Sequence, residues 1–279
     1  MRVIRLPQLQ NVNTNNRASI RLPLGVTYQK LYFQLGTNIL TSLITNIVLR
    51  INNKEVQRWN SVADLNSGLN FYRQQLTGQT NFFVLDFTER FAREEVGMML
   101  GTIAATQEAG VQEMTLEFDL GAYAQVAAST ITGWADVESP SANRIVQRVQ
   151  VQQKVIAAAA QEQIFVPFGM NGYQVKRIIL RHVNLTSVRV RRDGVDIYED
   201  LPIALDNQRL QDFGRLPQAG YKVIDFMPDT LQSNAFNTAM ILGLDGKPVP
   251  VQNLDIRLTT SAADTITVYT ESYSLNSQL

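Results

Sequence analysis

The chain has 279 residues, and 25 basic and 25 acidic side chains give it a formal net charge of zero at pH 7. This balance excludes binding to a nucleic-acid backbone through bulk positive charge. Cysteine is absent, which excludes disulfides, thiolate metal sites and cysteine nucleophiles. We expect neither a secretory signal in residues 1–7 nor a membrane-spanning helix, because no apolar run approaches the roughly 20 residues that a bilayer requires.

The first half of the chain begins with an amide-rich stretch and continues with short alternating segments. We interpret the stretch, residues 8–17, either as an arm that becomes ordered on contact with neighbours or a membrane, or as a frayed end. Ile47, Leu49 and Ile51 then recur at every second position up to the turn Asn52-Asn53, and residues 115–120 alternate between polar and apolar. This period of two predicts half-buried β-strands.

Four landmarks of the first half recur in the second half, in the same order and at a nearly constant offset of about 140 residues. The matched segments are 22–25 with 166–169, 44–47 with 185–188, 84–87 with 223–226, and 111–112 with 251–252. Tyr28-Gln29 likewise recurs as Tyr173-Gln174, and the turn Asn52-Asn53 becomes Asp193-Gly194. The sequence therefore indicates an internal duplication with its boundary near residue 141, within a polar, proline-containing connector.

Two helical segments are predicted at matching positions of both halves. The longer helices can be capped by Thr88 and Asp229. Their apolar stripes, at helical spacing, consist of Ala92, Val96, Met99 and Ile103 in the first half and Leu231, Ala235, Ala239 and Leu242 in the second. Shorter helices are expected within residues 61–71 and 202–213.

Short strands separated by turn residues fill most of the remaining chain. This pattern is typical of an all-β sandwich or barrel rather than of alternating βαβ units. Two halves joined by so short a connector are expected to share an interface. We therefore predict an all-β chain of two tandem sandwiches with about eight strands each, divided into residues 1–140 and 141–279.

Several of these segments resemble a known viral family. They are the opening Met1-Arg2, the strand 19–25 running into Thr27-Tyr28, and the later Ile224-Asp225-Phe226-Met227. Together they resemble the major capsid protein of corticoviruses, which are tailless, membrane-containing phages of marine bacteria. Each motif is short, and the resemblance depends on their collinear order along most of the chain and on the matching length.

The resemblance implies a double jelly roll, the architecture also found in tectivirus and adenovirus coat proteins. A trimer of such a chain presents six similar sandwiches around its axis, so that it forms a nearly hexagonal tile. In such viruses the shell encloses a lipid membrane and double-stranded DNA. The implied partners are further copies of the chain, neighbouring capsomers, minor capsid or vertex proteins, membrane proteins and the viral membrane, without sequence-specific contact to nucleic acid. The implied location is the virion, after synthesis in the host cytoplasm.

Histidine chemistry is poorly supported by the sequence. The single histidine, His182, lies on an apolar strand and shares a face with Ile178 and Leu180, which favours a structural role. A metal enzyme of the cupin type needs several histidine ligands. A serine triad would need His182 as its base, and no Gly-x-Ser-x-Gly elbow accompanies it.

The acidic motifs are also weak indicators of a site. Glu94-Glu95 and Glu199-Asp200 are carboxylate pairs of the kind that cleave glycosidic bonds, but neighbours on a helix diverge by about 100 degrees, so a solvated face is favoured for Glu94-Glu95. The corticovirus resemblance implies a structural calcium as an option, for which Asp193-Gly194-Val195-Asp196 or Asp245-Gly246-Lys247 could supply ligands, but neither has the spacing of a calcium loop. Turn formation explains both better. No catalytic, cofactor-binding or metal-binding residue is therefore assigned.

The densest basic cluster comprises Arg189, Arg191 and Arg192, with Arg177 and Arg181 on the preceding strand. Two interpretations are open. These side chains pair with acidic residues of a neighbouring subunit, or they are solvated or paired within the chain.

The sequence thus predicts a structural major capsid protein that is not an enzyme. The main alternative is a carbohydrate- or receptor-binding sandwich protein, such as a viral spike or lectin-like module, which would gather exposed aromatic residues at one loop end. Trp59 and Trp134 are isolated in sequence, which disfavours it. A second alternative is a sandwich-fold glycoside hydrolase, which would require two carboxylates that converge from facing strands.

Overall fold

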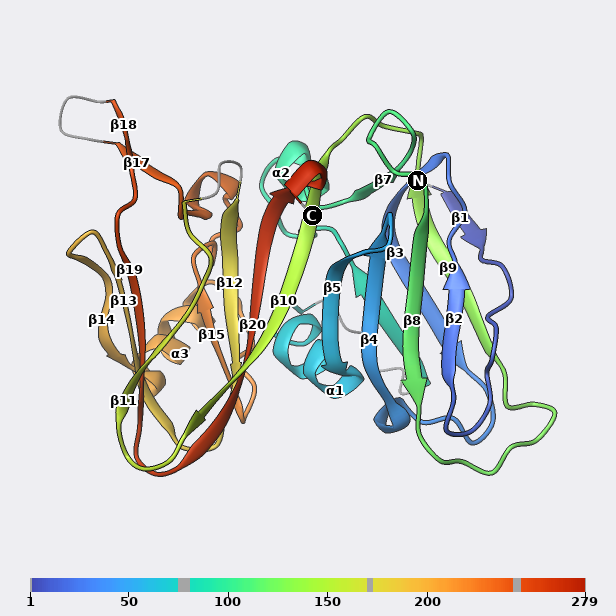
Figure 1. The fold of residues 1–279 in the computed structure, drawn as a ribbon, viewed down its shortest axis with the longest axis horizontal. Helices are drawn as coiled ribbons and strands as arrows, with labels where there is room; N and C mark the ends of the chain where they lie inside the picture. The colour runs from blue at the N-terminus through green and yellow to red at the C-terminus, as the bar shows by residue number, and fades with distance from the viewer. Residues whose placement is uncertain (1, 75–80, 170–172, 243–246, 279) are drawn as a thin grey trace.

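The computed structural model describes residues 2–74, 81–169, 173–242 and 247–278. Two β-sandwiches stand side by side with their strands roughly upright, and the N-terminal half of the chain forms the sandwich on the right (Figure 1). No helix in these ranges has the length and apolar composition of a membrane span. The two sandwiches form the all-β double jelly roll that the sequence predicts.

The first sandwich consists of two facing sheets. One sheet has the order β1-β9-β3-β6, with β7 also paired to β3, and the other has the order β5-β4-β8-β2. Their bounds are β1 Arg2–Arg5, β2 Arg17–Arg21, β3 Val26–Leu35, β4 Ile44–Ile51, β5 Lys54–Ser61, β6 Phe82–Asp86, β7 Ile103–Ala105, β8 Met114–Leu120 and β9 Ile131–Glu138. The alternating burial of β8, whose inward side chains are apolar, follows the predicted period of two.

The second sandwich repeats this arrangement. One sheet contains β15-β12-β20-β10, with β16 paired to β12, and the other has the order β11-β19-β13-β14. The bounds are β10 Ile145–Ile156, β11 Gln161–Ile164, β12 Gln174–Arg181, β13 Leu185–Arg192, β14 Val195–Pro202, β15 Tyr221–Asp225, β16 Phe236–Asn237, β19 Leu254–Thr260 and β20 Asp264–Leu275, while β17 Met240–Leu242 and β18 Pro248–Pro250 form a separate hairpin.

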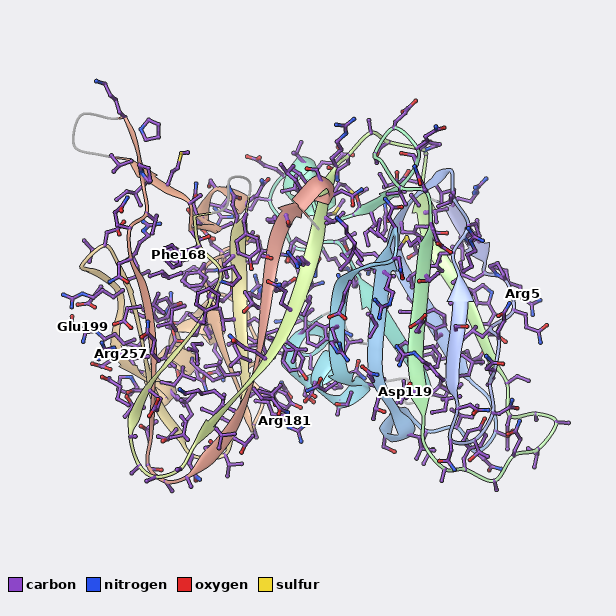
Figure 2. All side chains as sticks on the ribbon, in the orientation of Figure 1. Arg5, Asp119, Phe168, Arg181, Glu199 and Arg257 are labelled. Atoms are coloured by element: carbon purple, nitrogen blue, oxygen red, sulfur yellow. The ribbon has the colours of Figure 1, made fainter. Side chains whose placement is uncertain are left out.

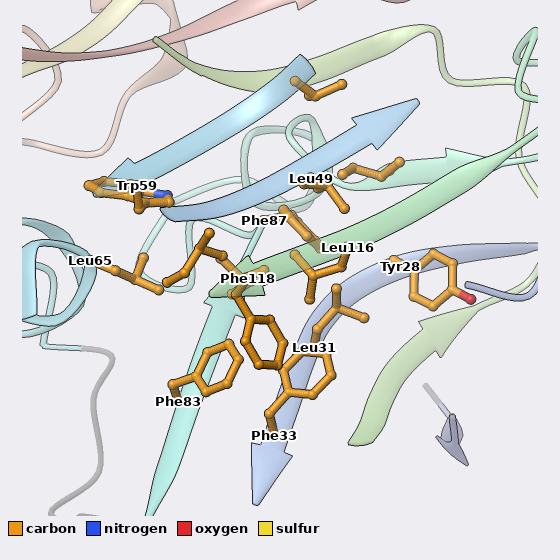
Figure 3. Packing of buried hydrophobic residues seen from close by; sticks show 14 of the residues in the cluster. Tyr28, Leu31, Phe33, Leu49, Trp59, Leu65, Phe83, Phe87, Leu116 and Phe118 are labelled. Carbon is orange, nitrogen blue, oxygen red and sulfur yellow. The ribbon is translucent and has the colours of Figure 1, made fainter. Parts of the chain in front are cut away.

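Each sandwich has its own apolar core. In the first, Phe33 stacks on Phe83 with ring centroids 4.8 Å apart, and Phe118 meets both rings edge-on (Figure 3). In the second, Phe226 stacks on Phe236 at 4.6 Å. Such aromatic pairs stabilise a core beyond their buried area. The two cores lie between the sheets, where the alternating side chains of facing strands meet.

The duplication is visible in a turn motif that occurs once in each sandwich. Asn52 has φ of 50°, and its side-chain oxygen accepts the backbone N–H of Gln112 at 2.8 Å. Asp193 has φ of 48°, and its carboxylate accepts the backbone N–H of Gln252 at 2.8 Å. Asn and Asp tolerate this left-handed conformation and bond nearby backbone groups. The acidic motif at Asp193 therefore serves a turn, as the spacing indicated, whereas Asp245 and Gly246 lie outside the described residues.

A bulge in the central strand also recurs, and it corrects one sequence match. The extra residue is Gln29 in β3 and Lys176 in β12. Their carbonyls accept the backbone N–H groups of Phe87 and Phe226, which occupy matching landmark positions. Gln29 therefore corresponds to Lys176 and not to Gln174, because the preceding connection is longer in the second half.

The shorter helices are confirmed and the longer ones are wrong. The segment after the first hairpin forms α1, Val62–Leu65, and a π-helical turn, η2, Asn66–Asn70, while its counterpart forms α3, Ile203–Asp212. The predicted first long helix is reduced to α2, Glu95–Met99. In the second half a 3-10 turn, η3, Gln232–Asn234, precedes β16 and β17.

Sheet pairing explains both errors. Ile103, the last member of the first apolar stripe, lies in β7 opposite Tyr28. Thr88 caps no helix, because its hydroxyl donates to Asp86 Oδ1 at 2.7 Å. In the second stripe, Ala235 and Ala239 are buried beside the strands of this loop. An apolar spacing of three and four residues was thus produced by alternating strands and turns, and tertiary contacts decided the structure.

Candidate functional site

The two sandwiches are joined by a shared sheet. Strand β10 pairs antiparallel with β20 along its whole length and meets β5 of the first sandwich in parallel, with Val149 opposite Gln57. The Gln57 side-chain amide also donates to the Gln147 carbonyl at 3.0 Å. The order β15-β12-β20-β10-β5-β4-β8-β2 therefore includes strands of both sandwiches, which are linked by this one residue pair between β10 and β5.

Beside this shared sheet lies a cluster of buried charges, which we call the junction cluster. Both sandwiches supply its cations and its carboxylates, and all are nearly or fully buried. Its members are Arg73, Asp86, Glu89, Lys176, Arg177, Arg215, Asp225 and Glu271. These are four positive and four negative groups, and the partly exposed Lys30 adds a fifth cation 3.0 Å from Asp86. Pairing of this kind is what burial of so many charges requires.

Arg177 is at the centre of the junction cluster. Its Nη1 lies 2.8 Å from Glu89 Oε1 of the first sandwich and 3.0 Å from Glu271 Oε2 of the second. Its Nε donates to Asp225 Oδ2 at 3.1 Å. Lys176 Nζ lies 2.6 Å from Glu89 and 2.9 Å from Glu271. Each carboxylate therefore faces at least one charge-assisted partner, and Glu89 ties the first sandwich to β12 of the second.

Electrostatics keeps the two glutamates ionised. Burial alone would raise the pKa of Glu89, but the positive charges of Arg177, Lys176 and Arg73 outweigh burial and hold this pKa well below its usual value. Burial opposes ionisation of Glu271 in the same way, and Lys176 and Arg177 lower its pKa. A glycoside hydrolase needs one carboxyl with a raised pKa as its general acid. These converging carboxylates are therefore unsuited to that chemistry.

A pH prediction follows from these lowered pKa values. Both carboxyls bind protons less readily in the folded chain than in the unfolded chain. Their contribution to stability is therefore complete above the ordinary glutamate pKa of about 4.3 and is lost as the pH falls through the folded-state values. We expect the free energy of unfolding, measured by denaturant titration, to fall between about pH 5 and pH 3. An unchanged slope in the variant Glu271→Gln would contradict this origin.

A second buried contact joins the sandwiches at Asp64 in α1. Its carboxylate accepts the hydroxyls of Tyr221 at 2.7 Å and Tyr269 at 2.8 Å, and Arg181 Nη1 lies 3.3 Å away. All three partners belong to the second sandwich, and Arg181 is labelled between the two sandwiches in Figure 2. Tyr269 also stacks on Trp59 with ring centroids 4.9 Å apart. Asp64 thus has hydrogen-bond donors from the second sandwich, whereas the buried indole nitrogen of Trp59 has no hydrogen-bond partner.

The arginines of the predicted basic cluster pair within the chain. Arg177 and Arg181 belong to the two junction contacts described above. Arg189 donates to Asp196 at 2.9 Å, Arg191 donates to the Gly194 carbonyl at 2.9 Å, and Arg192 donates to the Asn237 carbonyl at 2.9 Å. Of the two open interpretations, intramolecular pairing is therefore the one observed.

The other candidate residues of the sequence do not form a site. His182 follows the end of β12 and is half-buried, and burial lowers its pKa despite the nearby Asp264. Glu94-Glu95 and Glu199-Asp200 are exposed. Among the described residues, no group of three or more histidine, cysteine, aspartate or glutamate side chains could hold a metal ion.

Two further features bear on the sequence interpretations. Trp59 is fully buried and Trp134 is half-buried, so neither contributes an exposed aromatic cluster of the kind that a carbohydrate-binding module presents. The amide-rich stretch 8–17 packs on its own sandwich: Leu9 is buried, and Gln10 bridges to Ser19. This stretch therefore has contacts with its own sandwich.

Sequence reasoning missed the junction cluster as a unit. Its only sequence signal is the position of Lys176 and Arg177 within an otherwise apolar strand, and of Glu271 at an inward position of β20. A charge at an inward strand position indicates a buried partner, but the partners lie far away along the chain.

Comparison with known proteins gives consistent matches. The family models for the viral coat protein P2 N-terminal and C-terminal domains match residues 3–138 and 146–276. The crystal structure of the major capsid protein P2 from Bacteriophage PM2 superimposes with a TM-score of 0.84 at 16% identity, covering 98% of this chain and 97% of that chain. No curated protein sequence matches the chain.

More distant solved structures share the fold. The STIV major capsid protein has a TM-score of 0.65 at 12% identity, covering 99% of this chain and 98% of that chain. The PBCV-1 virus capsid protein has a TM-score of 0.58 at 10% identity, covering 98% of this chain and 92% of that chain. At these identities the likeness concerns the double jelly-roll fold alone.

Proposed function

The chain belongs to the viral coat protein P2 family and is a structural capsid protein of the virion, and we propose that its working unit is a homotrimer. In this proposal the two sandwiches, residues 1–140 and 141–279, act as two similar corners of a tile. Three copies give a pseudo-hexagonal capsomer, which packs edge to edge in an icosahedral shell around an internal membrane and double-stranded DNA.

The observation that carries the proposal is the fixed pairing of two similar sandwiches in one chain. A trimer has threefold symmetry, and only a chain with two similar corners gives it six similar sides. The shared sheet and the junction cluster hold these corners at one angle. Minor capsid, vertex and membrane proteins, and the membrane surface itself, are the further partners that a tile in such a shell would meet.

The mass of the protein in solution tests the trimer. We expect light scattering to give a stable species near three times 31.3 kDa across a range of salt and calcium concentrations. The controls are the same measurements at low protein concentration and after denaturation. A monomer at every concentration would overturn the preformed trimer and direct attention to glycan binding, the main alternative.

A further inference from the structure

Within one chain, the two sandwiches meet edge to edge through β5 and β10. The contact is parallel, with Val149 of β10 opposite Gln57 of β5. It covers the outer edge of β5, and Val149 is 1% exposed. Because of the duplication, each of these two strands has a counterpart in the other sandwich. Comparing the strand-pairing registers of the two sandwiches identifies these counterparts.

Strand β1 is the counterpart of β10. Val149 of β10 lies opposite Glu271, and Val3 of β1 lies opposite Asp136. The acids match, because Glu271 pairs with the residue after the bulge in β12 and Asp136 pairs with the residue after the bulge in β3. Val3 therefore occupies the position of Val149.

Strand β14 is the counterpart of β5. Both follow the turn described above, and both carry a register shift at the same place relative to their hairpin partner; β14 carries a second shift, between Val188 and Val190, that β5 lacks. Gln57 lies opposite Leu49 just after the shift, and Tyr198 lies opposite Val190 just after the shift. Tyr198 therefore occupies the position of Gln57.

In the structure both counterparts are unpaired on one side. Within the described residues, β1 pairs only with β9 and β14 pairs only with β13. They lie at opposite ends of the molecule, as Figure 1 shows, and Figure 2 labels Arg5 and Glu199 at these two ends. Val3 is 61% exposed although Val149, its counterpart, is 1% exposed. An edge strand with exposed apolar residues is a template for pairing with another chain.

The surface beside β14 has room for a further strand. A groove of about 920 Å³ lies there, and its lining includes Val195, Ile197 and Met240, which are 64%, 39% and 37% exposed. The side chains at the two edges are complementary in charge. β1 carries Arg2 and Arg5, whereas β14 carries the exposed acids Glu199 and Asp200; Asp196 of β14 is already paired with Arg189.

We propose that β1 of one copy adds in parallel to β14 of the next copy, with Val3 opposite Tyr198. This inference rests on the proposed trimer. The contact between copies would then repeat the β10 to β5 contact within a copy. A ring of three copies has three contacts of each kind, and the two kinds alternate around the ring. The contact is head-to-tail, and in a closed ring of three copies every β1 and every β14 is paired. The occupant of the β14 groove is thus a second copy of this chain.

An engineered cross-link tests the register. The chain has no cysteine, so the double variant Arg5→Cys/Asp200→Cys introduces the sole pair, at exposed positions near the proposed contact. The Cα atoms of neighbouring strands lie within the range that a disulfide spans. The control is Arg5→Cys/Glu162→Cys, because Glu162 lies on β11, the opposite edge of the sheet that contains β14.

Under mild oxidation we expect the first variant to lose its monomer band on a non-reducing gel and to give reducible dimer and trimer bands, while the control remains monomeric. Light scattering of the reduced proteins shows whether each variant still forms the trimer. A trimeric mass without cross-linking would overturn the β1 to β14 contact and leave the proposed function standing. A monomeric mass for the unmodified chain would overturn both.

Discussion

The variant Glu271→Gln is expected to lower the free energy of unfolding by about 3–5 kcal/mol, the cost of removing one partner from a buried ion pair. The amide has nearly the same shape as the carboxylate but no charge. Lys176 and Arg177 then lose the negative charge of a partner that lies 2.9 Å and 3.0 Å away, in a cluster with side chains that are fully buried. Denaturant unfolding at pH 7 measures the loss.

Two further variants separate charge from general damage. Glu94→Gln changes an exposed glutamate and is expected to alter stability by less than about 0.5 kcal/mol. Adding Lys176→Met to Glu271→Gln removes one positive charge and leaves Glu89 paired with Arg177. We expect it to restore part of the lost stability, because the two residues share one network. Equal losses in Glu271→Gln and Glu94→Gln would show that the junction cluster does not stabilise the fold.

The strands and the duplication were predictable because they depend on local patterns. Alternation over residues 47–51 and 115–120 indicates strands, and turn residues such as Asn52 and Asp193 mark the same hairpin in both halves. These signals require no knowledge of the partner strand. The matched order of four landmarks then indicated two similar sandwiches before any contact was known.

The two longer helices were mispredicted because the pattern on which they depended is ambiguous. Residues at intervals of three and four can lie on one side of a helix, but they can also be the buried members of a loop with short strands. The pairing of Ile103 with Tyr28 and the short strand Phe236–Asn237 on β12 decide between these possibilities. Both contacts join residues far apart in sequence, which a local pattern cannot represent.

The junction cluster could not be assembled from sequence for a similar reason. Arg177 and Arg181 look like members of a surface basic cluster when they are compared with their neighbours in sequence. Their partners Glu89, Glu271 and Asp64 lie on other elements, and only the placement of the second sandwich against the first brings them together. A charged side chain also gives the same sequence signal whether it is solvated or buried in a pair.

The two sandwiches differ in their charged side chains where they meet. In the first sandwich Lys30 lies 3.0 Å from Asp86, and Arg177 takes the matching place beside Asp225. Lys176, however, replaces the neutral Gln29 at the bulge, and Glu271 stands where the first sandwich has Asp136. The added charges of the second sandwich face Glu89 and Arg73 of the first. The duplication therefore kept the fold and changed the side chains that join the two copies.

The variant Asp64→Ala is expected to lower the free energy of unfolding by about 2–4 kcal/mol, because it leaves the hydroxyls of Tyr221 and Tyr269 without their acceptor at a partly or fully buried site. Arg181 contributes less, since its side chain is 57% exposed and solvent weakens the pair. The loss is expected in calorimetry as a lower unfolding temperature. The variant Asp64→Asn, which keeps one acceptor oxygen, should lose less.

The matched control for Asp64→Ala is Asp212→Ala, at an exposed position of α3. A rescue variant adds Tyr221→Phe and Tyr269→Phe to Asp64→Ala, so that no hydroxyl remains unsatisfied, and should recover part of the stability. If Asp64→Ala unfolded at the same temperature as Asp212→Ala, Asp64 would not hold the sandwiches together. The expected order of stability, in which the rescue variant exceeds Asp64→Ala, follows because an unpaired buried polar group costs more than an apolar replacement of both partners.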